Sequence, residues 1–154
     1  MSSSGARVIG IGIDAVDVPR FRAILERTPS MRERCFTLAE LAYADQKHDP
    51  TERLAARFAA KEATMKALSV GLGAFGFHDV EVLVDPGADP SGPPRLLLRG
   101  PAAEIAAQLG VHEFFVSLTH TATIAQAMVL AQATSHSQAF TIAERSENER
   151  QERR

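Results

Sequence analysis

Hydrophobic and polar residues alternate with the period of a β-strand over residues 8–14, close to the N-terminus. Isoleucines take one face of this predicted strand, whereas the other face carries two glycines and ends in Asp14. Because Gly10 and Gly12 have no side chains, that face admits either a ligand or the close approach of another backbone. We therefore expect Asp14 to stand beside a space that is kept clear of side chains.

The remaining pattern predicts helices and strands in mixed order. Capping residues, prolines and glycines mark the ends of the helices, and short apolar runs between turn signals mark the strands. The predicted helices span about residues 17–28, 37–44, 49–68 and 101–109. Further strands are predicted at about residues 80–84, 95–98, 113–118 and 123–130. Since neighbouring strands are joined directly, we predict the α+β fold class, with helices packed on a largely antiparallel sheet.

The longest predicted helix carries an acid on its apolar side. At about 3.6 residues per turn, Glu62 falls beside Leu54, Phe58 and Met65. An ionised carboxylate against a core costs several kcal/mol unless a cation or a metal ion compensates it. Glu62 therefore needs a partner, and partners of that kind are often functional.

One predicted strand and one predicted helix thus each present a carboxylate, at Asp14 and Glu62. Mg²⁺ commonly binds one or two carboxylates together with water and substrate phosphates. Lys66 lies one turn after Glu62, within reach of the same site, whereas Lys61 and Arg57 point elsewhere, toward phosphates or solvent. This pattern suits transfer from a metal-bound phosphate ester or anhydride. The alternative is a surface pair of Glu62 with Lys66, and an Asp14 that caps a turn.

Composition and charge narrow the class of protein. The chain has 154 residues, a net charge of -2 and 45% hydrophobic residues, which is typical of one globular domain. The start of the chain lacks the features of a signal peptide, and no apolar run approaches the roughly 20 residues that cross a bilayer. We therefore expect a cytoplasmic protein with no membrane partner. Cys35 is the only cysteine, which excludes an intrachain disulfide.

Arginines outnumber glutamates between residues 20 and 34, although charge nearly cancels over the whole chain. This excess indicates an acidic partner for the first helix rather than a nucleic acid, for which a much more basic domain is expected. The alternative is an ordinary solvated helix face.

Three motifs occur in order along the chain. They are Gly-Ile-Gly-Ile-Asp at residues 10–14, Arg-Phe-Ala-Ala-Lys-Glu-Ala at residues 57–63 followed by Lys66, and Val-Ser-Leu-Thr-His at residues 116–120. With these motifs the chain resembles the holo-acyl-carrier-protein synthase family, the small stand-alone 4'-phosphopantetheinyl transferases. The resemblance covers residues 7–131 and leaves an N-terminal extension at residues 1–6 and a polar, charged tail at residues 132–154.

The resemblance implies a reaction. The serine hydroxyl of an apo acyl carrier protein attacks the pyrophosphate of coenzyme A, phosphopantetheine moves to the serine, and adenosine 3',5'-bisphosphate leaves. Asp14 and Glu62 would hold Mg²⁺ on the pyrophosphate, and Lys66 would stabilise the leaving phosphate. Glu62 or a metal-bound water could accept the proton. No residue is an obvious covalent nucleophile, which fits direct transfer.

The resemblance also implies contacts with both substrates. The candidate coenzyme A contacts are Lys61, Lys66 and His120. His120 would contact a phosphate or shape the pocket, or else it is a turn histidine bonded to neighbouring threonines. Arg20 is similar to a family position that meets the acidic face of the carrier protein. The expected docking patch, whose effect weakens with salt, consists of Arg20, Arg22 and Arg27.

Small members of the family look like homotrimers with active sites between subunits, and we expect the same assembly here. The chain departs from the family pattern at Pro93, where a lysine is common, and in the loop at residues 69–73. Two other functions stay open: a non-catalytic module that binds an acyl carrier protein, and a different Mg²⁺-dependent enzyme of nucleotide phosphates. The carrier protein could serve fatty acid or polyketide synthesis.

Overall fold

A computed structural model describes residues 5–84 and 92–134 of the chain. The helical elements are α1 (Val18–Arg27), α2 (Met31–Cys35), α3 (Leu38–Asp45), α4 (Pro50–Ala67), α5 (Gly100–Gln108) and the short 3-10 helix η1 (Phe77–Asp79). The strands are β1 (Ala6–Asp17), β2 (Val80–Leu83), β3 (Arg95–Leu98), β4 (Glu113–His120) and β5 (Ile124–Thr134). This order confirms the α+β fold class. Every element except α2 and η1 was predicted, with boundaries that differ by a few residues.

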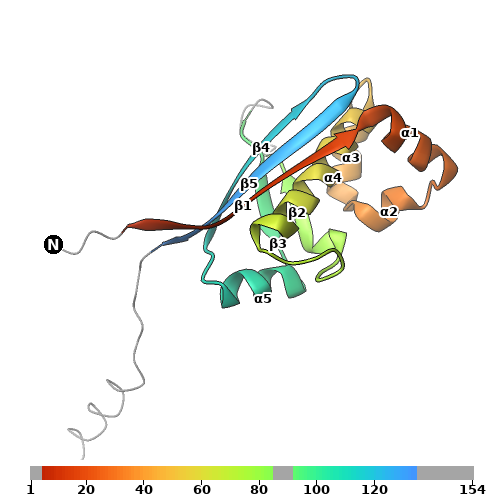
Figure 1. The fold of residues 1–154 in the computed structure, drawn as a ribbon. Helices are drawn as coiled ribbons and strands as arrows, with labels where there is room; N and C mark the ends of the chain where they lie inside the picture. The colour runs from red at the N-terminus through yellow and green to blue at the C-terminus, as the bar shows by residue number, and fades with distance from the viewer. Residues whose placement is uncertain (1–4, 85–91, 135–154) are drawn as a thin grey trace, which may run out of the picture.

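The strands form two antiparallel sheets. One sheet has three strands in the order β1-β5-β4, and the other consists of β2 and β3. In Figure 1 the three long strands form a twisted ribbon, α4 lies along one face of it, and α1, α2 and α3 gather at one end. Helix α4 contacts all three long strands and also α1, α3 and β2, so it is the central helix of the fold.

The two glycines of β1 allow α4 to approach the strand backbone closely. A Cβ atom added at Gly10 would lie 1.9 Å from the carbonyl oxygen of Ala67, and one at Gly12 would lie 1.8 Å from that of Ala63. No side chain fits at such distances. Of the two possibilities that the sequence left open at this face, close backbone approach is therefore the one observed.

A hydrophobic cluster, separate from the core between α4 and the three-stranded sheet, joins α1 and α2 to the start of α4. Phe21 of α1 packs edge-on against Phe36, with ring centroids 6.4 Å apart, and it also contacts Phe58 of α4 at 5.4 Å. Asp17 caps α1 by accepting a hydrogen bond from the Arg20 amide. The polypeptide therefore leaves β1 and enters α1 with its orientation set by packing as well as by capping.

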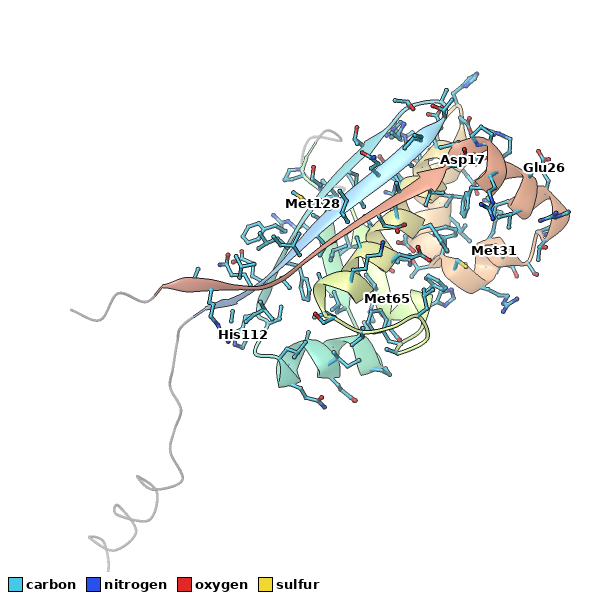
Figure 2. All side chains as sticks on the ribbon, in the orientation of Figure 1. Asp17, Glu26, Met31, Met65, His112 and Met128 are labelled. Atoms are coloured by element: carbon cyan, nitrogen blue, oxygen red, sulfur yellow. The ribbon has the colours of Figure 1, made fainter. Side chains whose placement is uncertain are left out.

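The outer face of the three-stranded sheet, which is turned away from α4, is apolar and exposed. Ile11 is 61% exposed and Ile13 is 60% exposed, and Met128 pairs directly with Ile13 on β5. Figure 2 shows Met128 on the strands and Met65 on α4; the first is half exposed and the second is buried. Large apolar side chains gathered on one face usually mark an interaction surface.

The limits of the predicted domain lie close to the ends of the sheet. β1 begins at Ala6, and β5 runs to Thr134, past the predicted limit at residue 131. Residues 1–4 and 135–154, which make up most of the predicted N-terminal extension and tail, lie outside the described residues. Within residues 5–84 and 92–134, no helix combines the length and the apolar character needed to cross a membrane.

Candidate active site

The contact between β1 and α4 brings Asp14 and Lys66 together. The Lys66 ammonium lies 2.8 Å from the Asp14 carboxylate and donates a second hydrogen bond to the carbonyl of Ile13 at 2.9 Å. Asp14 follows Gly12 on the face of β1 that meets α4, and its side chain is only 12% exposed. The expected reach of Lys66 toward this acid is confirmed.

Glu62 lines the same cavity, one helical turn before Lys66. This cavity has a volume of about 270 Å³, and its wall contains Asp14, Glu62, Lys66 and Met65. Burial, reinforced by the charge of Asp14 and a hydrogen bond to it, raises the pKa of Glu62 to about 7, and Lys66 opposes this rise. Two neighbouring, partly buried carboxyl groups repel each other when both are ionised, so each disfavours the ionisation of the other. A divalent cation between them would relieve this repulsion.

The donor set fits a magnesium ion better than a metal held by protein ligands alone. Within the described part of the chain, no three His, Cys, Asp or Glu side chains gather in a metal-binding arrangement. Two carboxylates leave most of the coordination sphere to water and substrate phosphates, which is the usual environment of Mg²⁺. Asp14 lies within β1 opposite Ala127 and does not cap a turn, and Lys66 pairs with Asp14. The part of the simpler alternative in which Asp14 caps a turn is therefore wrong.

The loop that follows α4 closes one side of this cavity through Val70, Gly71 and Leu72. It begins at Ser69, whose φ of 56° is the only positive φ among the described residues other than glycine. The Val70 amide donates a hydrogen bond to the carbonyl of Met65 at 3.0 Å, so α4 ends in a Schellman motif. In this motif the position of Ser69 is usually occupied by glycine. The serine therefore holds a strained conformation next to the acids.

We expect Ser69→Gly to stabilise the protein by about 0.5 to 1 kcal/mol, because glycine adopts this φ without a Cβ clash. Thermal unfolding followed by circular dichroism measures the change. Ser117→Gly is the matched control, since Ser117 lies in β4, where glycine weakens a strand. A lower melting temperature for Ser69→Gly than for the unmodified chain would contradict the assigned strain.

Lys61 does not face a phosphate or solvent, contrary to our expectation. It is fully buried, and its ammonium lies 2.8 Å from Glu40, 2.8 Å from the carbonyl of Phe77 and 2.7 Å from that of Val80. These three partners use all three ammonium hydrogens. Glu40, which is 1% exposed, also accepts hydrogen bonds from the Thr37 and Val82 amides. Lys61 therefore fastens α4 to its neighbours and has no hydrogen left for coenzyme A.

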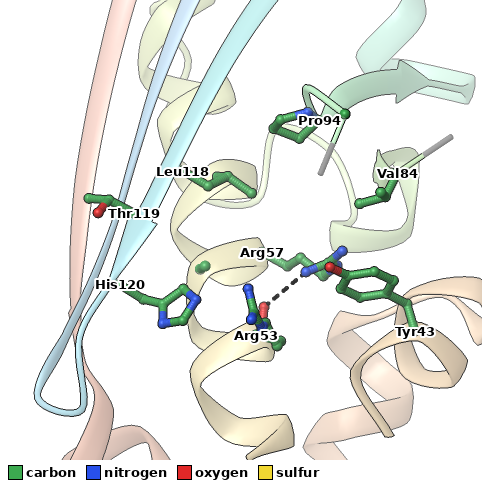
Figure 3. A pocket seen from close by; sticks show the side chains of 10 residues that line it. Tyr43, Arg53, Arg57, Val84, Pro94, Leu118, Thr119 and His120 are labelled. Atoms are coloured by element: carbon green, nitrogen blue, oxygen red, sulfur yellow. Dashed lines mark hydrogen bonds between the residues drawn. The ribbon is translucent and has the colours of Figure 1, made fainter. Parts of the chain in front are cut away.

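A second cavity, of about 390 Å³, lies where α3, α4 and β4 meet. Figure 3 shows Arg53 and Arg57 on α4, Tyr43 beside the Arg57 guanidinium, and His120 across from them at the end of β4. His120 lines this cavity, and its Nδ1 lies 3.3 Å from a carboxylate oxygen of Glu52. The sequence analysis did not predict Arg53 or Tyr43 here, although Arg53 precedes Arg57 by one helical turn.

Arg57 is the most unusual residue of this second cavity. Its side chain is only 3% exposed, and burial lowers the pKa of its guanidinium from the ordinary value. One terminal nitrogen donates to the carbonyl of Arg53 at 3.3 Å, whereas Nε has no hydrogen-bond partner among the described residues. A buried cation with an unused donor is a favourable contact for an anion.

The two cavities lie on opposite sides of α4. Glu62 follows Arg53, and Lys66 follows Arg57, by nine residues, which is about two and a half helical turns. Side chains separated by a half-integral number of turns project in opposite directions. The two acids with Lys66 therefore face away from Arg53 and Arg57 of the same chain.

Of the three arginines in the expected docking patch on α1, Arg22 has partners within the chain. Arg22 forms a bidentate ion pair with Asp49, at 2.7 Å and 3.2 Å, and also donates to the Thr51 hydroxyl at 3.1 Å. This bond lowers the pKa of Asp49, which caps α4. Arg22 thus joins α1 to α4, whereas Arg20 and Arg27 remain exposed.

Residues 10–141 match the profile of the 4'-phosphopantetheinyl transferase superfamily. A holo-acyl-carrier-protein synthase of Streptomyces avermitilis is 46% identical over 125 residues, which cover 81% of this chain and 98% of the relative. The acyl carrier protein synthase of Plasmodium yoelii with ADP bound superposes with a TM-score of 0.73 at 30% identity, covering 85% of this chain and 99% of that one.

A holo-acyl-carrier-protein synthase of Bacillus anthracis in complex with coenzyme A (3',5'-ADP) has a TM-score of 0.66 and 31% identity, and the match covers 82% of this chain and 98% of that one. Sequence and fold agree over nearly the full length of these relatives. The chain therefore belongs to the 4'-phosphopantetheinyl transferase superfamily and, within it, to the holo-acyl-carrier-protein synthase family.

Proposed function

We propose that this protein transfers 4'-phosphopantetheine from coenzyme A to a serine of an apo acyl carrier protein in the cytoplasm and releases adenosine 3',5'-bisphosphate. The observation that carries the proposal is the convergence of Asp14, Glu62 and Lys66 on one cavity at the contact of β1 with α4. A module that only binds the carrier protein would not need two partly buried acids beside a lysine.

The residues of this cavity have distinct roles. Asp14 and Glu62 would hold Mg²⁺, which supplies a positive charge that neutralises the pyrophosphate when it is bound. Lys66 is exposed enough to leave Asp14 for a phosphate oxygen, because half of its side chain faces solvent. Its ammonium would then stabilise the negative charge on the leaving phosphate. Glu62 is the candidate acceptor for the serine proton.

The second cavity is suited to the phosphate-bearing nucleotide end of coenzyme A. Arg53 and Arg57 supply two positive charges in one wall, to which His120 adds an imidazole and Tyr43 an aromatic ring. Pro93 replaces the lysine that is common in the family, and neighbouring Gly92 and Pro94 line this cavity. The arginines would therefore carry most of the electrostatic attraction for the nucleotide.

We propose that the complete site forms between two chains of a homotrimer. A single ligand cannot have neighbouring phosphates in contact with both sides of α4 in one chain, but an adjacent chain could supply the other half. The apolar outer face of the sheet, which includes Ile11, Ile13, Phe115 and Met128, offers a surface for self-association.

Ile13→Glu is therefore expected to convert the trimer to monomers and to reduce transfer to the same degree, because a charge would enter the buried interface. Light scattering after gel filtration measures the mass. The control is Leu38→Glu, which places the same charge at a leucine of α3 that is 85% exposed. A stable monomer of the unmodified protein at working concentration would contradict the proposal.

Arg20 and Arg27 lie seven residues apart on α1, so they project from the same side of the helix and both are exposed. We propose that these two arginines, without Arg22, attract the acidic face of the carrier protein. The attraction between surface charges weakens as the ionic strength rises.

The test of the proposed function is the intact mass of an apo acyl carrier protein after incubation with this protein, coenzyme A and Mg²⁺. We expect the carrier protein to gain the mass of one phosphopantetheine, and EDTA to prevent the gain. Carrier proteins of fatty acid and of polyketide synthesis are assayed side by side. If all of them stay unmodified but still bind, the protein is a binding module.

A further inference from the structure

Helix α3 presents two side chains to two cations of α4 in antiparallel register. Glu40 contacts Lys61, and Tyr43, one turn further along α3, contacts Arg57, one turn earlier on α4. The first pair is sealed, because each ammonium hydrogen of Lys61 has a protein acceptor. The second pair differs, because the face of an aromatic ring contacts the cation and Nε of Arg57 is left without a partner among the described residues.

The contact between Tyr43 and Arg57 is close. The central carbon of the guanidinium lies 4.1 Å from the centroid of the tyrosine ring, well within the range of a cation–π interaction. Figure 3 shows the two side chains next to each other at the wall of the second cavity, which both of them line. The guanidinium donates a hydrogen bond to the carbonyl of Arg53 and also interacts with the Tyr43 side chain by hydrogen bonding, whereas its Nε is buried without a partner among the described residues.

We propose that Tyr43 is a positioning residue that holds the buried Arg57 guanidinium ready for an anionic nucleotide. The aromatic face compensates the buried charge and leaves Nε without a protein partner among the described residues, so that this donor remains available to a phosphate oxygen. A carboxylate at the same place would neutralise the guanidinium and compete with the nucleotide. The inference rests on the proposed function, since it takes the nucleotide end of coenzyme A as the ligand of this cavity.

The test is calorimetric binding of adenosine 3',5'-bisphosphate in EDTA, which removes any contribution of a metal ion. Tyr43→Leu is expected to raise the Kd about five- to tenfold, whereas Tyr43→Phe, which keeps the aromatic face, stays within about twofold. In the Arg57→Ala background, Tyr43→Leu is expected to change the Kd by less than about twofold. The KM for coenzyme A should rise with the Kd, and kcat and the KM for the carrier protein should not change.

A merely structural role for Tyr43 predicts a different result. Tyr43→Leu would then weaken binding equally with and without Arg57, or would lower kcat, and either outcome overturns the proposal. Circular dichroism checks folding, and Tyr43→Met replaces Tyr43→Leu under the same criteria if the leucine variant does not fold. Absence of nucleotide binding by an active unmodified protein overturns this inference alone. Tight nucleotide binding without phosphopantetheine transfer overturns the proposed function instead.

Discussion

Glu62→Gln is expected to lower Mg²⁺-dependent phosphopantetheine transfer by at least about 10²- to 10³-fold, and Asp14→Asn should cause a similar loss. Each substitution removes one of the two carboxylates in the cavity that Lys66 shares. The amide keeps the volume of the side chain, so the effect comes from charge and metal affinity. Transfer is measured by intact mass over a series of Mg²⁺ concentrations.

The fold of the Glu62→Gln variant should be preserved. Burial and the charge of Asp14 raise the pKa of Glu62 to about 7, so the folded state disfavours its ionisation. Because of this group, the folded protein becomes less stable as the pH rises from the ordinary pKa of a glutamate toward about 7. Glutamine does not ionise and causes no such loss. In EDTA at pH 8 the variant should melt at the same temperature as the unmodified chain or higher. Glu104→Gln, on the exposed side of α5, should leave transfer unchanged. Full activity of both acid variants would refute the metal site.

Lys61→Met is expected to destabilise the protein by about 3 to 5 kcal/mol, which is the usual cost of leaving one charge of a buried ion pair without its partner. Lys61 and Glu40 are 2.8 Å apart, and neither side chain is exposed. The substitution would also leave the carbonyls of Phe77 and Val80 without their donor. Urea denaturation measures the free energy of unfolding.

Lys66→Met is the matched control, five residues further along α4. Its ion pair with Asp14 is partly exposed, so its loss should cost no more than about 1 kcal/mol, although transfer should be strongly reduced. The two lysines are thus expected to separate stability from catalysis. Equal stability of the two variants would mean that the buried pair does not hold α4 in place.

The sequence was sufficient for features that depend on neighbours along the chain. The alternating pattern predicted β1, and capping residues with prolines predicted α1, α3 and α4, because these signals act within one or two turns. The one-turn spacing of Glu62 and Lys66 likewise predicted that both would reach one site. The short α2 was missed because it has neither a side-chain cap nor a long apolar pattern.

Where the structure changed our interpretation of a candidate residue, its partner lies far along the chain. Arg22 is an exposed helix residue by its pattern, but Asp49 lies 27 positions away and binds it. Periodicity placed Lys61 off the apolar stripe of α4, but α3, η1 and β2 cover that side of the helix as well. A periodic pattern indicates which faces are apolar, whereas it carries no information about which polar faces a neighbouring element will cover.

The sequence by itself determined the strands and the longer helices of this protein, the clear face of β1 and the pair of acids with their lysine, because each follows from local geometry and short spacing. Only the tertiary structure decided that Lys61 is buried against Glu40, that Nε of Arg57 has no partner among the described residues, and that two cavities lie on opposite sides of α4. These properties arise from packing between distant segments, where burial determines whether a charge is a structural partner or is available to a ligand.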